Sequence, residues 1–363
     1  MPTTPPASRL AWLDHVRAAG ILLVVAGHAI RSLDRSGLPT ADWLVALDDA
    51  IYSFHMPLFF MLAGMTQGLG RRKGVAAALQ ALFWGIVLPY LIWSSVWVAL
   101  KTGFADAVNA PVTGSPFAIL WQPIDHFWFL YTLAILRIVW IGVEATGSAL
   151  ARRLAILVPL VAAFVGLPAA GGPVVDTYLF FWAAFYGVGV VAVHEAPEIR
   201  GRALVLLTLV AEVVWLGAMV LDPAAVDADF GPVRTLIAFA GVFTLIGTVL
   251  ICAPGGLAGR LAGFVGEASL AIFLTHTLFG AVARLALERL GLLSPGTLLV
   301  AAIVAGVVGP TLAYAAVLRA DAALGRPLAR WIGFGTQRRS HYFDLGRPAR
   351  AAGGAVSLDG RAG

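Results

Sequence analysis

The stretch Trp12–Ile30 reads WLDHVRAAGILLVVAGHAI, an apolar run with a charged foot at Asp14 and Arg17 and one imidazole, His28, near its far end. His28 lies eleven positions after Arg17, which corresponds to a helical rise of roughly 16 Å. That rise is about half the thickness of a bilayer core. An ionisable group at such depth usually faces the bundle interior or a water-filled cavity. The sequence leaves open a second interpretation, a core histidine bonded to a neighbouring helix.

The composition outside this stretch is that of a polytopic membrane protein. Hydrophobic residues make up 60% of the 363 residues and charged residues only 12%, whereas an average soluble domain is about 25% charged. The single cysteine, Cys252, excludes an internal disulfide and a thiol-based metal site, and we expect no metal. The net charge of +5 comes from Lys and Arg residues between apolar spans, so it indicates membrane topology and not nucleic-acid binding.

Hydropathy predicts an all-α bundle of about ten transmembrane helices. With the N-terminus inside, 18 of the 25 Lys and Arg residues fall on the cytoplasmic side, so both termini are expected to be cytoplasmic. Residues 1–320 would form the membrane domain and residues 321–363 a basic cytoplasmic tail that is partly disordered. The expected spans lie near 17–35, 51–69, 75–99, 127–147, 153–170, 177–194, 203–221, 234–252, 264–283 and 296–318.

Further imidazoles lie in or beside other expected spans. His55 lies about one turn inside its span, and His276 lies twelve residues into a span starting near Phe264, a rise of about 18 Å. Three helices can therefore bring His28, His55 and His276 to neighbouring depths. His126 and Trp128 are expected at the outer interface, where Trp128 fits an aromatic belt better than a catalytic role.

A tight basic cluster, Arg71, Arg72 and Lys73, follows the second expected span. A positive-inside stop signal explains it fully. A site for a polyanionic ligand such as coenzyme A would use the same residue types, because guanidinium groups bind phosphates in a bidentate manner.

Five local motifs occur in order along the chain, at the expected ends of spans. They are the Arg17-to-His28 spacing after Trp12-Leu13-Asp14, the run Phe54-His55-Met56-Pro57-Leu58-Phe59-Phe60 followed by Ala63-Gly64 and the basic cluster, Leu88-Pro89-Tyr90, Trp128-Phe129-Leu130 after His126, and the run from Ser269 to His276. Each motif is weak alone, but together they resemble the acyltransferase 3 family of integral-membrane acyltransferases.

The resemblance implies a multi-pass enzyme of the bacterial inner membrane, with cytosolic acyl-CoA as donor. Acetyl is the favoured acyl group, and the acceptor would be a carbohydrate or lipid-linked glycan. By motif match Arg17 and His28 form the essential pair, with His28 as general base, a role worth about 10²- to 10⁴-fold in rate. His55 and His276 are second-rank catalytic candidates. Arg71, Arg72 and Lys73 would bind the donor, and His126 and Trp128 the acceptor.

Three other functions fit parts of the sequence. A transporter of a lipid-linked sugar or small molecule would also line its path with histidines, although no inverted repeat is visible. A haem-binding cytochrome would use imidazole axial ligands, but no span has two well-placed histidines. A structural scaffold would leave the intramembrane imidazoles without a purpose.

Overall fold

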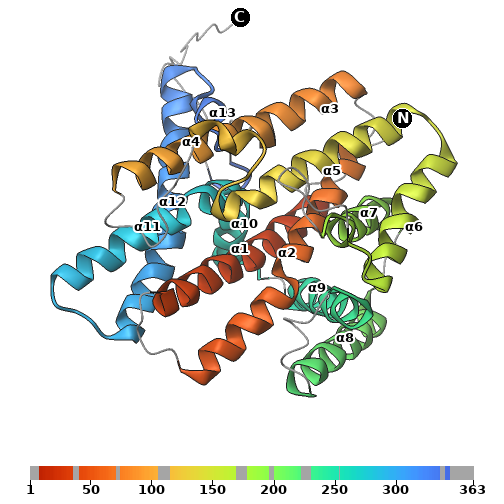
Figure 1. The fold of residues 1–363 in the computed structure, drawn as a ribbon, viewed down its shortest axis with the longest axis horizontal. Helices are drawn as coiled ribbons and strands as arrows, with labels where there is room; N and C mark the ends of the chain where they lie inside the picture. Colours follow the sequence, from red (N-terminus) through yellow and green to blue (C-terminus); the bar gives the residue numbers. More distant parts are fainter. Residues whose placement is uncertain are drawn as a thin grey trace, which may run out of the picture.

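The structure is a computed structural model that describes residues 8–35, 41–70, 74–104, 115–168, 178–195, 200–221, 230–252, 254–335 and 340–343. These residues form helices and contain no strand, so the all-α prediction is confirmed (Figure 1). The α-helices are α1 (Ser8–Arg35), α2 (Asp42–Gly70), α3 (Val75–Leu82), α4 (Leu88–Gly103), α5 (Trp128–Ala145), α6 (Ala149–Val165), α7 (Leu179–Glu195), α8 (Gly201–Leu221), α9 (Pro232–Cys252), α10 (Gly256–Glu267), α11 (Ser269–Arg289), α12 (Pro295–Leu324) and α13 (Leu328–Trp331).

Eight helical segments within the described residues are long and apolar enough to cross a membrane. They include eight of the ten expected spans. The other two, near 153–170 and 177–194, coincide with α6 and α7, which have 17 residues each. The protein is therefore a multi-pass membrane protein. Within the tail, which we expect to be partly disordered, residues 344–363 lie outside the described residues.

Helix α1 lies at the centre of the bundle, where it packs against α2, α9, α10, α11 and α12. In Figure 1 it crosses the middle of the view, with α8 and α9 at one edge and α11 and α12 at another. Most of α8 exposes large apolar side chains. This exposure fits a helix that faces lipid tails, which are as apolar as its side chains.

Two glycine residues allow α2 and α7 to approach each other very closely. A Cβ on Gly64 of α2 would lie 2.0 Å from the carbonyl oxygen of Tyr186, and a Cβ on Gly189 of α7 would lie 2.1 Å from that of Met61. Small residues at such crossings let helix backbones pack in the absence of a hydrophobic driving force. The Ala63-Gly64 motif is thus a packing device that fixes α2 against α7.

The third span is continuous from Val75 to Gly103 but contains a π-helical turn, Phe83–Val87, just before Pro89. Proline lacks the N–H that would continue the regular hydrogen-bond ladder. The next residue, Tyr90, donates its phenol hydrogen to the carbonyl oxygen of Ile119. The Leu88-Pro89-Tyr90 motif therefore anchors the 3-10 turns that lead to His126.

Candidate functional site

Three imidazoles from three separate elements meet inside the bundle. The ring centroid of His28 lies 5.0 Å from that of His276 and 5.7 Å from that of His126. The centroids of His126 and His276 lie 5.2 Å apart. We call these residues the imidazole cluster. It joins α1, α11 and the short 3-10 turn that precedes α5.

Burial distinguishes the members of the cluster. His126 and His276 expose 6% and 2% of their surface, whereas His28 is only partly buried. His28 is therefore the most exposed member of the imidazole cluster.

The hydrogen bonds of His276 define its tautomer. Its Nδ1 lies 2.9 Å from the carbonyl oxygens of both Ile272 and Phe273. A carbonyl only accepts, so Nδ1 must carry the proton, and in the neutral ring Nε2 is then the acceptor. Among the described residues no group lies within hydrogen-bonding distance of this buried Nε2.

His55 lies behind the cluster and not in it. Its ring packs edge-on to Tyr52 at 4.5 Å, and the Tyr52 ring in turn lies 6.4 Å from His28. Its Nδ1 lies 2.8 Å from the carbonyl oxygen of Ile51, so it too donates to its own helix. The structure thus places His126, and not His55, beside the other two imidazoles.

The Tyr52 ring, which lies between His28 and His55, is supported by two charged residues. The guanidinium of Arg31 lies 3.1 Å from the Tyr52 ring centroid, a cation–π contact. Arg31 also pairs with Asp48 at 2.7 Å. Arg31 follows His28 by one helical turn, so this contact network fixes α1 to α2 directly beside the cluster.

The backbone conformation of the preceding residue, Asp125, helps to position His126. Asp125 has a φ of 44°, a left-handed conformation that Asp tolerates better than most residues. Its Oδ2 accepts a hydrogen bond from Trp97 Nε1 at 2.5 Å and pairs with Lys101 Nζ at 2.7 Å. Two contacts from α4 therefore stabilise the turn that points His126 at the cluster.

Trp128, expected at the outer interface, lies among core aromatic residues. Its ring centroid is 5.2 Å from that of Trp182 and 6.2 Å from that of Phe60. His126, expected at the same interface, is buried. The segment carrying both residues packs into the bundle.

Arg17 lies at the opposite end of α1 from the cluster, as the spacing predicts. Its Nη1 pairs with Oδ1 of Asp14 at 2.8 Å. The side chains of Arg17 and Asp14 are 28% and 12% exposed, so the arginine is accessible from outside while its partner is nearly covered. Arg17 therefore lies at a distance from the imidazole cluster.

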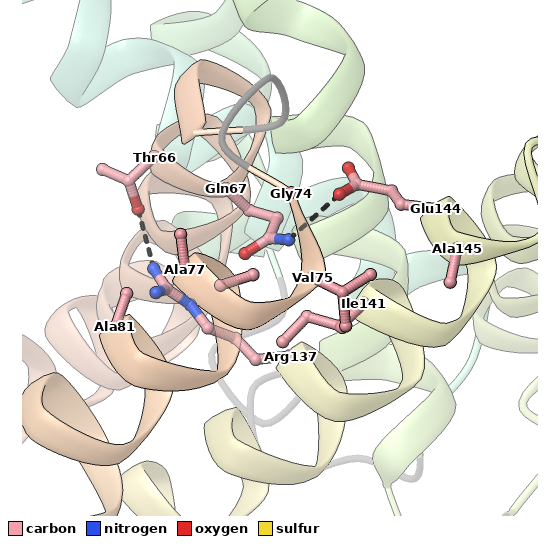
Figure 2. A pocket seen from close by; sticks show the side chains of 11 residues that line it. Thr66, Gln67, Gly74, Val75, Ala77, Ala81, Arg137, Ile141, Glu144 and Ala145 are labelled. Atoms are coloured by element: carbon pink, nitrogen blue, oxygen red, sulfur yellow. Dashed lines mark hydrogen bonds between the residues drawn. The ribbon is translucent and has the colours of Figure 1, made fainter.

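A cavity of about 260 Å³ lies between α2, α3 and α5 at the same end as Arg17. Figure 2 shows Thr66 and Gln67 reaching it from α2, and Arg137 and Glu144 from α5. Arg137 Nη2 donates to Thr66 at 3.0 Å, and Gln67 Nε2 donates to Glu144 at 3.4 Å. One guanidinium and one carboxylate balance each other here, so this cavity is not a strongly cationic phosphate site by itself.

The expected donor-binding residues Arg71, Arg72 and Lys73 lie outside the described residues. They directly precede Gly74, which lines the cavity. Within the described residues no group of three or more His, Cys, Asp or Glu side chains is arranged to hold a metal ion.

Sequence reasoning missed two groups of residues beside the imidazole cluster. They are Trp97, Lys101 and Asp125, which support the turn that carries His126, and Arg31 and Tyr52, which lie beside His28. The adjacency of Asp125 and His126 was the one available signal for the first group. Trp97 and Lys101 contact Asp125, which lies more than twenty positions further along the chain. No local sequence pattern predicts contacts at that separation.

Comparison with known proteins places this arrangement in a family. The chain is 25% identical to Nodulation protein NolL of Mesorhizobium japonicum over 208 residues, which cover 56% of this chain and 55% of that protein. The chain thus spans about half the length of the curated relative it matches. No solved structure matches. The family model Acyl_transf_3, described as an acyltransferase domain, matches residues 10–315, including every residue of the imidazole cluster, and the chain belongs to this acyltransferase family.

Proposed function

We propose that the protein is an O-acyltransferase of the bacterial inner membrane that takes an acyl group from cytosolic acyl-CoA. The favoured group is acetyl, and the acceptor is a hydroxyl of a carbohydrate or lipid-linked glycan. One observation carries the proposal: the ring centroid of a partly exposed imidazole, His28, lies 5.0 Å from that of a buried imidazole, His276, and the acceptor nitrogen of His276 has no hydrogen-bond partner among the described residues. Family membership supports acyl transfer as the reaction.

In this proposal His28 is the general base. As the acceptor oxygen bonds to the thioester carbonyl carbon, its proton passes to the neutral imidazole of His28. The carbon–sulfur bond then breaks, and the departing thiolate takes that proton from the imidazolium. Such positioned proton transfer contributes about 10²- to 10⁴-fold. His276 orients His28 or shares its proton through Nε2, and His55 supports the Tyr52 ring, against which it packs.

The donor approaches from the end of the bundle that carries Arg17. The rise from Arg17 to His28 is roughly 16 Å, so an extended carrier arm is needed to bring a thioester from one to the other. Coenzyme A has such an arm, with phosphates at its far end. Arg17 binds these phosphates together with Arg71, Arg72 and Lys73, because guanidinium and ammonium groups pair with phosphate.

The test is transfer of label from radioactive acetyl-CoA into glycan by membranes that contain His28→Gln or His28→Ala. We expect a loss of at least about 100-fold, in line with removal of a general base. His15→Gln is the matched control, because His15 lies on the same helix but bonds to the carbonyl oxygen of Gly259 at 3.0 Å. Full transfer by both His28 variants would remove His28 from the mechanism.

The same assay separates direct transfer from an acyl-histidine intermediate. If label accumulates on the protein when acceptor is omitted, the acyl group passes through the enzyme; direct transfer leaves the protein unlabelled. Movement of acceptor across the membrane without release of free thiol would show transport in place of acyl transfer.

A further inference from the structure

The carboxylate that pairs with Arg17 is itself held from the far end of the chain. Oδ1 of Asp14 pairs with Arg17, and Oδ2 accepts a hydrogen bond from the phenol of Tyr342 at 2.8 Å. Both oxygens are thus engaged, so the carboxylate cannot rotate without losing a partner. Asp14 is 9% exposed, so water does not easily replace a lost partner.

Helix α10 forms a seat for the segment Ser340–Phe343, which carries Tyr342. A Cβ on Gly263 would lie 2.1 Å from the Tyr342 ring, so only glycine leaves room for it. Arg260 Nε donates to the Tyr342 carbonyl oxygen at 3.1 Å. Arg260 and Gly263 are three residues apart and share one face of the helix.

A third residue of this face fixes the beginning of the segment. The Glu267 carboxylate accepts hydrogen bonds from the Ser340 hydroxyl and the His341 N–H, both at 2.6 Å. Arg260 also lies 4.8 Å from the Phe343 ring centroid. The segment Ser340–Phe343 therefore contacts α10 through its backbone and side chains, while the Tyr342 hydroxyl reaches Asp14 on α1.

The surroundings of Tyr342 keep its phenol protonated, so that it can donate a hydrogen bond. Burial, and then the Asp14 carboxylate, raise the pKa of the Tyr342 phenol. A neutral phenol donates its hydrogen to Asp14 throughout the physiological range. Ionisation of Tyr342 therefore does not break the Asp14–Tyr342 hydrogen bond in that range.

We propose that Tyr342 is a positioning residue for donor binding, which holds Asp14 so that the Arg17 guanidinium stays aimed at the donor phosphates. The inference rests on the proposed function, since it assumes that Arg17 contacts the donor. It assigns a role to a residue that lies beyond the 10–315 region matched by the family model.

The test compares Tyr342→Phe, which removes only the hydroxyl, with Gly263→Ala, which displaces the ring. The measurements are KM for acetyl-CoA, KM for the acceptor, kcat and the unfolding temperature. Tyr342→Phe is expected to raise KM for acetyl-CoA by about threefold to tenfold, less than the tenfold or more that a direct hydrogen bond to a charged group is worth, because the lost bond acts on Arg17 only through Asp14. Acceptor KM should stay at its wild-type value, and the unfolding temperature should fall only modestly, because Asp14 loses one of its two partners. Gly263→Ala should change donor KM in the same direction and more strongly.

Two controls and a double variant define the outcome. Tyr131→Phe removes a phenol that donates to the Leu120 carbonyl oxygen away from Asp14, and Gly142→Ala adds a methyl group to open space. In an Arg17→Ala background, Tyr342→Phe should add no further increase in donor KM, because it acts through Arg17. An unchanged donor KM in Tyr342→Phe, or an equal loss of all parameters together with stability, would overturn the inference. A wild-type enzyme that transfers nothing from acetyl-CoA would instead refute the proposed function.

Discussion

The rings of His28 and His276 lie 5.0 Å apart, centroid to centroid, although they come from the first and the eleventh helix. Nδ1 of His276 is committed to two backbone carbonyls, which leaves Nε2 as an acceptor inside the cluster. This relationship makes His276 the group best placed to influence the protonation of His28.

His276→Asn tests that relationship. An Asn side chain can keep a donor near the position of Nδ1 but offers no group at the position of Nε2. We expect kcat to fall by about 10- to 100-fold, less than the full worth of a general base, with little change in the KM values. Steady-state kinetics on detergent-purified protein check this, with the unfolding temperature as a control for folding. Wild-type kcat in His276→Asn would show that Nε2 has no part in the reaction.

The sequence identified the histidines as candidate site residues, but it did not predict which three of them meet in the imidazole cluster. The spacing of Arg17 and His28 along α1 follows from counting residues along a regular helix, because the rise per residue is constant. The same count was wrong for His276, because the expected span from Phe264 is broken at Ala268 and His276 lies in α11, which begins at Ser269. The position of His126 does not follow, since it precedes a helix in a 3-10 turn whose path depends on Tyr90, Trp97 and Lys101. Long-range contacts decide such a turn.

The tautomers and the tail contact were likewise beyond sequence reasoning. The proton position on His276 depends on which ring nitrogen faces its own helix, a rotamer choice made by packing. The contact between Tyr342 and Asp14 joins the two ends of the chain. No periodicity along the sequence signals a pairing at that separation.

The left-handed backbone of Asp125 gives a second prediction. Replacement by Ala removes both contacts to α4 and leaves a β-carbon in a conformation that costs about 1–2 kcal/mol. Asp125→Gly loses the same contacts but not the conformational fit. We therefore expect Asp125→Ala to be less stable than Asp125→Gly, with activity reduced in both because His126 loses its support. Thermal unfolding and label transfer measure the two effects. A variant order reversed in stability would contradict the strain argument.

The close crossing of α2 and α7 predicts strong sensitivity to a single methyl group. Gly64→Ala and Gly189→Ala would each place a Cβ about 2 Å from a backbone oxygen of the other helix. Overpacking of this kind typically costs about 1–3 kcal/mol, and backbone atoms yield less readily than side chains. We expect lower unfolding temperatures and poor expression in both variants. Gly217→Ala, which meets nothing within 4 Å, is the control; equal stability of all three would refute the crossing.

The cavity between α2, α3 and α5 gives a prediction about donor entry. It lies at the Arg17 end of the bundle, because α1 and α2 run antiparallel, with Gly20 close to Leu58 and Gly27 close to Tyr52, and Gly74 is among its lining residues. If the carrier arm of the donor passes through it, Ala78→Leu fills space that the arm needs and raises KM for acetyl-CoA. Ala76→Leu, on the exposed side of the same helix and not among the lining residues, should leave KM unchanged. Equal KM values in the two variants would place donor entry elsewhere.

The carboxyl group of Glu267 predicts how stability depends on pH. Burial raises its pKa above the ordinary value of 4.5, and the Asp14 carboxylate acts in the same direction, against hydrogen bonds from Ser340 and His341 that lower it. A raised pKa means that the folded state favours the protonated form. The stability that Glu267 contributes is thus fully present below pH 4.5 and is lost as pH rises through the raised pKa. We expect Glu267→Gln, which does not titrate, to lose less unfolding temperature than the wild type as pH rises from this value toward neutrality. Parallel curves of unfolding temperature against pH would show that Glu267 ionises normally in the folded protein, and the docking of Ser340 and His341 would then carry no pH dependence.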